Sequence, residues 1–292
     1  FGSRARVAAP AACADRAMRL QLGAGVAIAA AAAGVLPARA HYEETSTSCS
    51  FTLRPGTGAD SWTHKEVDVL LAEAFAISGE FQPLPAEEVR EIDEPAQTSA
   101  NASACAPSTY VPLPVDEVLL HPGFGFHSGA AVHDLGAGLG RPTLRAVLLH
   151  GASAGVGVEL SATRWRSGCT ALRQLDRRLA MPAARPQSLS PARVELHLGD
   201  ALGADVSDAT HVLFFATCFP AEMLRWMQKK LLEELPSGAR IFCAGSRGLW
   251  PSRLEAAAGR ALVQGDLEDD ILQRVWSIEE DGDATGASQR EL

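Results

Sequence analysis

Hydrophobic residues recur with different periods along the chain, and the change of period divides it near residue 109. Apolar residues recur at helical spacing from Val67 to Ile77, directly after the capping-box pattern THKE of residues 63–66, which predicts a helix. Residues 41–60 contain the turn-rich stretch RPGTGADS and are predicted to form a loop. Residues 86–108 are acidic and lack a hydrophobic period, which predicts a flexible linker. The part 41–108 is therefore expected to be a helical extension followed by an acidic linker.

From residue 109 onward, short apolar runs alternate with segments of helical period. Strands are predicted at 131–135, 155–160, 194–198, 211–216 and 240–244, and helices at 141–149, 164–179 and 220–235. This alternation predicts an α/β fold with a Rossmann-like, mostly parallel sheet and helices on both faces. Val275 and Trp276 indicate a late strand. The domain is therefore expected to cover 109–278, and 279–292 is expected to be a disordered tail.

The first forty residues combine several arginines with an apolar run. The run covers residues 22–36, and Ala38-Arg39-Ala40 follows it like a signal-type cleavage site. Its 15 residues are too few to span a bilayer. Residues 1–40 are interpreted as a targeting segment for an organelle or the secretory pathway, with a packed alanine-rich helix as the alternative. No membrane span is expected once such a segment is removed.

The charge of the chain limits the kinds of partner that it can have. The net charge is −9, and residues 41–105 hold 12 acidic against 3 basic residues. An acidic surface repels nucleic acid and tolerates a basic protein, although solubility alone is its ordinary meaning. A basic, lysine-bearing protein is the expected partner, and nucleic acid is not expected.

The cysteines give no sign of a metal site. The six cysteines are scattered, without a C-x-x-C pair and without a histidine at ligand spacing. This argues against zinc and against a small disulfide framework, and most of the cysteines are expected to be buried thiols. No metal is expected.

The stretch AVHDLGAGLG places three glycines behind the first predicted strand of the domain. Asp134 is followed by Gly136, Gly138 and Gly140, so the spacing is G-x-G-x-G and departs from the dinucleotide fingerprint G-x-G-x-x-G at Arg141. Glycine is required where the backbone turns tightly and approaches a ligand closely. The turn alone is a weak signal, since a purely structural turn has the same composition.

Acidic residues end the next two predicted strands. Glu159 closes the strand GVGVE, where a carboxylate can accept hydrogen bonds from ribose hydroxyls. Gly199 and Asp200 close the strand VELHL, where Asp200 can accept from an adenine amino group and Leu202 can cover the ring. Each acid alone is typical of a solvated loop. Three consecutive strand ends with this chemistry together favour an adenosine-containing ligand.

In this order and spacing the residues resemble the class I S-adenosylmethionine-dependent methyltransferases over about 109–260. The resemblance implies S-adenosyl-L-methionine as the cofactor. It implies that Asp134 and the glycine turn surround the methionine part of the cofactor, Glu159 the ribose and Asp200 the adenine. The superfamily closes its sheet with a two-stranded hairpin, of which this chain is expected to supply only part.

A closer resemblance, carried by HVLFFATCFPAEMLRWMQKKLLEELPSGARIFCAG, is to the disruptor-of-telomeric-silencing type of histone lysine methyltransferases and protist relatives. It implies that Thr217 positions the acceptor, that Phe219 lines an apolar channel, and that Tyr110 matches a tyrosine ahead of the glycine turn. Two departures stand out: that family carries asparagine in the loop that here reads Ala-Thr-Cys-Phe, and its Tyr-Gly-Glu loop is reduced to the tyrosine. Trp226 is expected in the core of the following helix.

Three functions remain open on these residues. The first is a methyltransferase that acts on a protein lysine, because a narrow apolar channel favours the neutral amine and no dedicated base is then needed. The second is a small-molecule or RNA methyltransferase with the same cofactor half, since the fold does not select the acceptor. The third is a catalytically degenerate methyltransferase fold that serves as a binding or assembly subunit. A targeting segment would argue against a nuclear, chromatin-directed role.

Overall fold

The computed structural model describes residues 40–53, 63–78, 83–97, 115–180, 191–216, 219–244, 253–255, 260–264 and 273–280. Within these residues the strands are β1 (Ala40–Glu44), β2 (Ser48–Leu53), β3 (Ala131–Leu135), β4 (Ala154–Glu159), β5 (Ala192–Leu198), β6 (His211–Phe215), β7 (Arg240–Ala244), β8 (Arg253–Glu255), β9 (Arg260–Gln264) and β10 (Gln273–Glu280). The helices are α1 (His64–Ser78), α2 (Ala86–Gln97), α3 (Val115–Leu119), α4 (Arg141–Leu148), α5 (Ala162–Ala180) and α6 (Ala221–Glu234), with the 3-10 turns η1 (Pro122–Phe124) and η2 (Ala201–Gly203).

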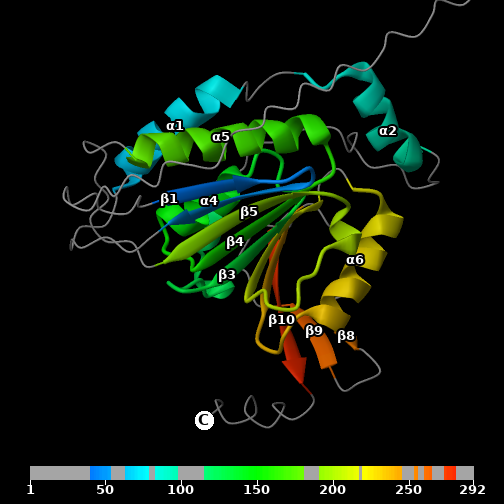
Figure 1. The fold of residues 1–292 in the computed structure, drawn as a ribbon. Helices are drawn as coiled ribbons and strands as arrows, with labels where there is room; N and C mark the ends of the chain where they lie inside the picture. Colours follow the sequence, from blue (N-terminus) through cyan, green and yellow to red (C-terminus); the bar gives the residue numbers. More distant parts are fainter. Residues whose placement is uncertain are drawn as a thin grey trace, which may run out of the picture. The chain divides into compact units, whose positions relative to one another are not determined.

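All the described strands form one sheet (Figure 1). Its order is β1-β2-β5-β4-β3-β6-β7-β10-β9-β8. The five strands from β5 to β7 in this order are parallel, and the chain reverses its direction across the sheet between β3 and β6. The hairpin of β9 and β10 follows, with β10 antiparallel to β7. This order is that of a Rossmann-like class I methyltransferase fold, so the predicted fold is confirmed and the closing hairpin is present.

Helices cover both faces of the sheet. One core cluster joins α1, α4 and α5 to the inner faces of β2, β3 and β5. A second cluster packs α6 against β6 and β7. On α6 the residues Met227 and Leu231 are fully buried, whereas Trp226 is 56% exposed. The expectation that Trp226 lies in the core is wrong, because Met227 and Leu231 lie on one helix face and the preceding position is turned about 100° away from it.

The N-terminal part differs from its prediction in two places. Residues 40–53 are a hairpin, where a loop was expected, and β2 pairs antiparallel with β5 at the sheet edge. The alternating burial of Cys49, Phe51 and Leu53 explains the strand, since period-two burial is what a half-buried strand requires. Residues 86–97 form α2, where a flexible linker was expected. The capping box of α1 is confirmed, because Oγ1 of Thr63 accepts from the Glu66 amide at 3.3 Å.

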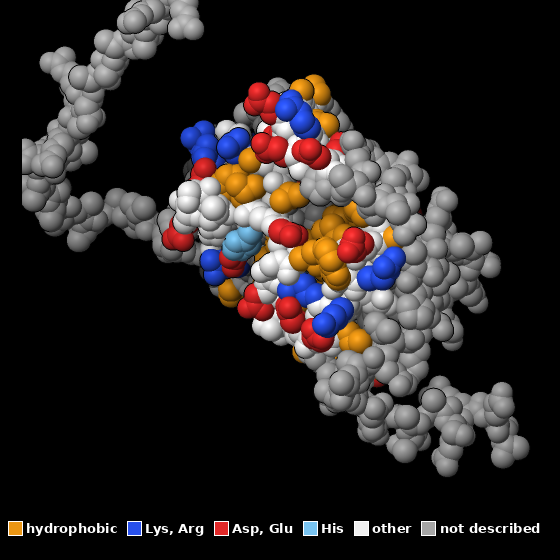
Figure 2. Space-filling model, turned by 90° about the vertical axis from the view of Figure 1, so that its right-hand side faces the viewer, with side chains coloured by type: hydrophobic (Ala, Val, Ile, Leu, Met, Phe, Trp, Pro, Cys, Tyr) orange, Lys and Arg blue, Asp and Glu red, His pale blue; other side chains and the backbone are white. Residues whose placement is uncertain are grey.

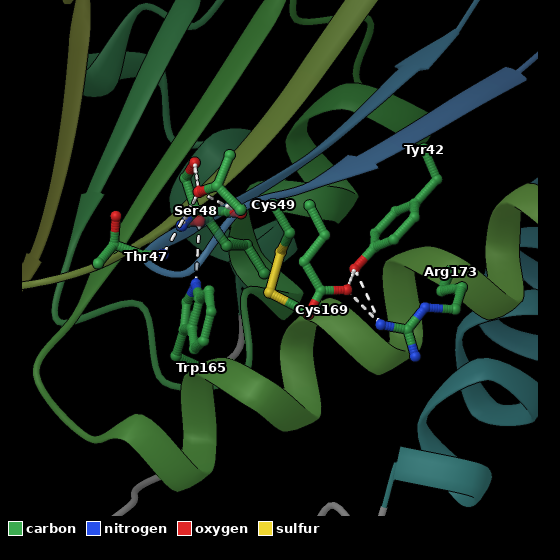
Figure 3. Close-up of a disulfide and its surroundings, with 10 residues drawn as sticks. Tyr42, Thr47, Ser48, Cys49, Trp165, Cys169 and Arg173 are labelled. Carbon is green, nitrogen blue, oxygen red and sulfur yellow. Dashed lines mark hydrogen bonds and ion pairs between the residues drawn. A yellow bond between two sulfur atoms is a disulfide. The ribbon is translucent and has the colours of Figure 1, made fainter. Parts of the chain in front are cut away.

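A disulfide joins Cys49 of β2 to Cys169 of α5 (Figure 3). The expectation that these two cysteines are thiols is wrong. The fold brings together two residues that are 120 positions apart, and the local spacing of the cysteines does not indicate such a pair. Cys243 is buried, as expected. Beside the disulfide, Arg173 of α5 pairs with Glu44 of β1, and Trp165 of α5 donates to the Leu196 carbonyl at 3.0 Å. The hairpin is therefore tied to α5 by covalent and polar contacts.

Within the described helices, none is both long and apolar enough to cross a membrane. The predicted targeting segment, 1–40, lies outside the described residues except for its last position.

Candidate functional site

The carboxyl ends of β3, β4, β5 and β6 meet at the point where the strand order reverses. Open parallel sheets bind their ligands at this position. Figure 2 looks onto this edge, where hydrophobic side chains gather in the middle of the face and carboxylates lie beside them. Four of the strand ends predicted from the sequence are thus brought to one place.

The glycine turn after β3 is held by backbone hydrogen bonds to β4. The amides of Gly136 and Ala137 both donate to the Val158 carbonyl at 2.9 Å. Gly136, Gly138 and Gly140 have φ angles of +88°, +57° and +77°, in the left-handed region that favours glycine. The turn therefore has the conformation that its composition predicts.

The third glycine is needed for packing as well as for conformation. Gly140 is the N-terminal cap residue of α4, and a Cβ on it would lie 2.7 Å from Cδ2 of Leu196. Gly140 was predicted to contact a cofactor. The structure gives it a clear packing role against β5, and it leaves any contact with a cofactor as a prediction.

Glu159 at the end of β4 is bound to the glycine turn. Its Oε2 accepts from the Gly138 amide at 2.7 Å, and its Oε1 accepts from the Ser161 amide at 2.8 Å. Burial raises the pKa of this carboxyl, although the two amides favour the charged form. The amide of Gly199, at the end of β5, donates to the Glu159 carbonyl at 3.0 Å. Three predicted residues are therefore in direct contact, and Glu159 is the centre of the arrangement.

Asp134 lies beneath the turn, fully buried on the side of α4. Its Oδ2 accepts from the Thr143 hydroxyl at 3.3 Å. Among the described residues, its Oδ1 has no hydrogen-bond partner. Burial raises the pKa of Asp134 to about 7, and the charge of Glu159 adds to the rise while the Thr143 hydrogen bond opposes it. Thr143 was not predicted; its place on the first turn of α4 beside the glycine turn was the available signal.

The end of β5 is more open. Asp200 is exposed and accepts from the Leu202 amide at 2.9 Å, which caps η2. Leu202 is half-buried and packs against the second core cluster. Leu160, directly after Glu159, is 54% exposed. Sequence reasoning missed Leu160, although its position after the acidic strand end could have identified it.

Phe219, which precedes α6, lies over the glycine turn. A Cβ built on Gly136 would be 3.3 Å from its ring, and its ring centre is 5.2 Å from that of Phe214. Phe219 therefore lies beside the glycine turn, and its role in lining an acceptor channel stays a prediction. Thr217 and Tyr110, the other two predicted catalytic residues, lie outside the described residues.

Comparison with protein-family models and with curated protein sequences gives no match. Solved structures similar in fold include an RNA methyltransferase from Salinibacter ruber, with 23% identity over 59% of this chain and 93% of that chain and a TM-score of 0.38. Another is the M1A22 tRNA methyltransferase from B. subtilis, with 17% identity, 60% and 68% coverage and a TM-score of 0.35. A third is an S-adenosylmethionine-dependent methyltransferase from Geobacter sulfurreducens, with 19% identity, 56% coverage of both chains and a TM-score of 0.34. At these levels of similarity, the fold assignment depends on the strand order of the chain itself.

Proposed function

We propose that the chain binds S-adenosyl-L-methionine at the carboxyl edge of its sheet and transfers the methyl group to an acceptor. The observation that carries the proposal is the direct hydrogen bonding of Glu159 to the glycine turn at the strand-order reversal. The three-glycine spacing excludes the dinucleotide fingerprint, which agrees with a ligand that has no pyrophosphate.

The residues present fit this cofactor. Each carboxylate oxygen of Glu159 accepts one backbone hydrogen bond, which leaves accepting capacity for ribose hydroxyls. Oδ1 of Asp134 has no hydrogen-bond partner among the described residues and the pKa of that carboxyl is raised, so the group is suited to a cationic neighbour. The ammonium group of the cofactor would supply a positive charge on this side of the turn. Asp200 and Leu202 remain the candidates for the adenine end.

Once bound, the cofactor supplies an electrophilic methyl group on its sulfonium sulfur. The contribution of the chain is then alignment and exclusion of water. Phe219 offers an apolar surface over Gly136, beside the proposed methionine position. An apolar surface favours a neutral nucleophile over a charged one.

A lysine side chain of a basic protein is the proposed acceptor. The net charge of −9 favours the approach of a cationic partner and disfavours a nucleic acid. The Cys49–Cys169 disulfide favours an acceptor that is met in an oxidising compartment over one in chromatin, because disulfides are rare in nuclear proteins. The test must distinguish this lysine acceptor from an RNA or small-molecule acceptor, and from a non-catalytic binding role.

Calorimetric titration with S-adenosylmethionine tests the cofactor, and transfer of a labelled methyl group to protein, RNA and metabolite fractions tests the acceptor. Binding by the wild type, weakened about tenfold or more in Glu159→Gln, supports the proposal. Glu91→Gln on the exposed face of α2 removes the same charge away from the turn and is the matched control. If the wild type does not bind S-adenosylmethionine, the proposed activity is overturned and the role of a binding or assembly subunit remains. If the label is found only in RNA or metabolites, the protein acceptor is overturned.

A further inference from the structure

A second carboxylate reaches the corner between β4 and α5 from outside the Rossmann-like core. Glu88 of α2 accepts through Oε1 from the Ser161 hydroxyl at 2.6 Å and from the Thr163 amide at 3.0 Å. Its Oε2 accepts from the Thr163 hydroxyl. The carboxylate therefore caps the first turn of α5, where free amides and the helix dipole favour a negative charge. In Figure 1, α2 lies beside this end of α5.

Ser161 connects this contact to the glycine turn. Its hydroxyl donates to Glu88 and accepts from the Arg164 amide at 3.1 Å, while its own amide donates to Glu159 at 2.8 Å. Glu159 in turn accepts from Gly138 at 2.7 Å. One continuous chain of hydrogen bonds thus runs from α2 through Ser161 and Glu159 to the turn.

Glu88 is ionised in this arrangement. Desolvation at the docked helix opposes its charge, but the hydrogen bonds from Ser161 and Thr163 and the charge of Arg166 outweigh it, so its pKa lies below the ordinary value. A charged acceptor makes stronger hydrogen bonds than a neutral one. The three contacts therefore anchor α2 at this corner through the Glu88 carboxylate.

The remaining surface of α2 shows which side faces the corner. Val89 and Ile92 are half-buried, while Glu87, Arg90 and Glu91 are exposed. Leu160, between the two residues of the hydrogen-bond chain, presents apolar surface at the same corner, with 54% of it exposed. Apolar surface beside a docked helix and a ribose-type acceptor suits a ligand that carries a flat aromatic base.

We propose that α2 covers the adenosine end of the cofactor site and that Glu88 is the positioning residue that holds it there and fixes Glu159 through Ser161. This inference rests on the proposed function, because it names the part of the same cofactor that α2 faces. Glu88 acts through Ser161 and Thr163, so its loss is expected to weaken the binding of any ligand that contains adenosine, whatever else the ligand carries.

The test compares Glu88→Gln with Glu91→Gln in the full chain, with S-adenosylhomocysteine and 5′-methylthioadenosine as calorimetric probes. Glu88→Gln is expected to weaken both ligands by the same factor of about tenfold, since both contain adenosine. Glu91→Gln is expected to bind both like the wild type. Hydrogen exchange of α2 in the wild type is the second measurement: saturating S-adenosylhomocysteine is expected to slow it, which a purely structural helix cap would not produce.

The outcomes separate this inference from the proposed function. A wild type that binds neither probe overturns both. A wild type that binds, with equal affinity in Glu88→Gln or with unchanged exchange in α2, overturns only the covering role of α2. The exchange measurement does not depend on any variant, so it decides the question even if Glu88→Gln is too unstable to titrate.

Discussion

Removal of the Cys49–Cys169 disulfide should cost the fold several kcal/mol. The cross-link closes a loop whose ends are 120 residues apart. For a loop of this length the chain-entropy relation gives about 5 kcal/mol at 25 °C, and measured losses are typically about 2–4 kcal/mol. Cys49→Ala/Cys169→Ala is therefore expected to lower the free energy of unfolding by about 3–5 kcal/mol. Both cysteines are buried against α5 and β2, so the alanines also leave small cavities that add to the loss.

Urea unfolding, followed by circular dichroism with and without a reductant, measures this loss. With a slope of about 2 kcal/mol per molar urea, the midpoint of the double variant should fall by about 2 M. Reductant should lower the wild-type midpoint in the same direction and leave that of the double variant unchanged. Two free thiols at these positions in native protein, or a reduced wild type that unfolds at the same urea concentration as the oxidised one, would refute the reasoning.

Three further predictions concern single side chains. The pKa of Asp134 is raised to about 7, so its contribution falls as pH rises from about 4 to 7, by up to about 4 kcal/mol, and the stability of the wild type relative to Asp134→Asn in urea unfolding should fall by this amount over the same range. Burial lowers the pKa of His211 to about 4, so its contribution should fall by about 2 kcal/mol between pH 7 and pH 5, seen as a loss of wild-type stability relative to His211→Asn in the same titration. Gly140→Ala places a Cβ 2.7 Å from Leu196 at a φ of +77° and should lower the melting temperature by several degrees. Gly203→Ala has open space and is the control; equal melting temperatures of the two variants would contradict the packing argument.

Asp134 and His211 change the stability of the fold in opposite directions in mild acid. Between about pH 4 and pH 6.5, acidification relieves the buried charge of Asp134 and at the same time adds an unfavourable charge at His211. The wild-type stability is therefore expected to vary less over this range than that of either variant. A steep loss in Asp134→Asn and a gain in His211→Asn on acidification would be consistent with this opposition.

The sequence predicted the central sheet well because local patterns determine it. The apolar run at β3 ends at Asp134 and a glycine turn, and β7 ends where its apolar residues end, so the limits of both strands are confirmed. The contact of Glu159 with the turn also followed from strand order, since neighbouring parallel strands place their carboxyl ends side by side.

The errors concern features that depend on distant residues. Residues 40–53 form a hairpin because β2 pairs with the free edge of β5. The local sequence does not indicate this pairing, since the turn-rich stretch that follows it favours a loop. The docking of α2 depends on Glu88 and its partners more than 70 positions away. The disulfide and the exposure of Trp226 likewise follow from how the elements pack. Thr217 and Tyr110 remain predictions.

The hairpin of β1 and β2, at one edge of the sheet, has a consequence for how the domain can be divided. A chain that begins at residue 109, where the hydrophobic period changes, would lack β1 and β2 and would leave the backbone donors and acceptors of β5 open along one side. Cys169 would then be an unpaired thiol beneath that open edge. An uncovered strand promotes strand addition between copies, and an unpaired thiol beside it can form a disulfide between them in an oxidising environment. The hairpin thus covers the open edge of β5, and a shortened form of this domain should keep residues 40–53 to avoid this association.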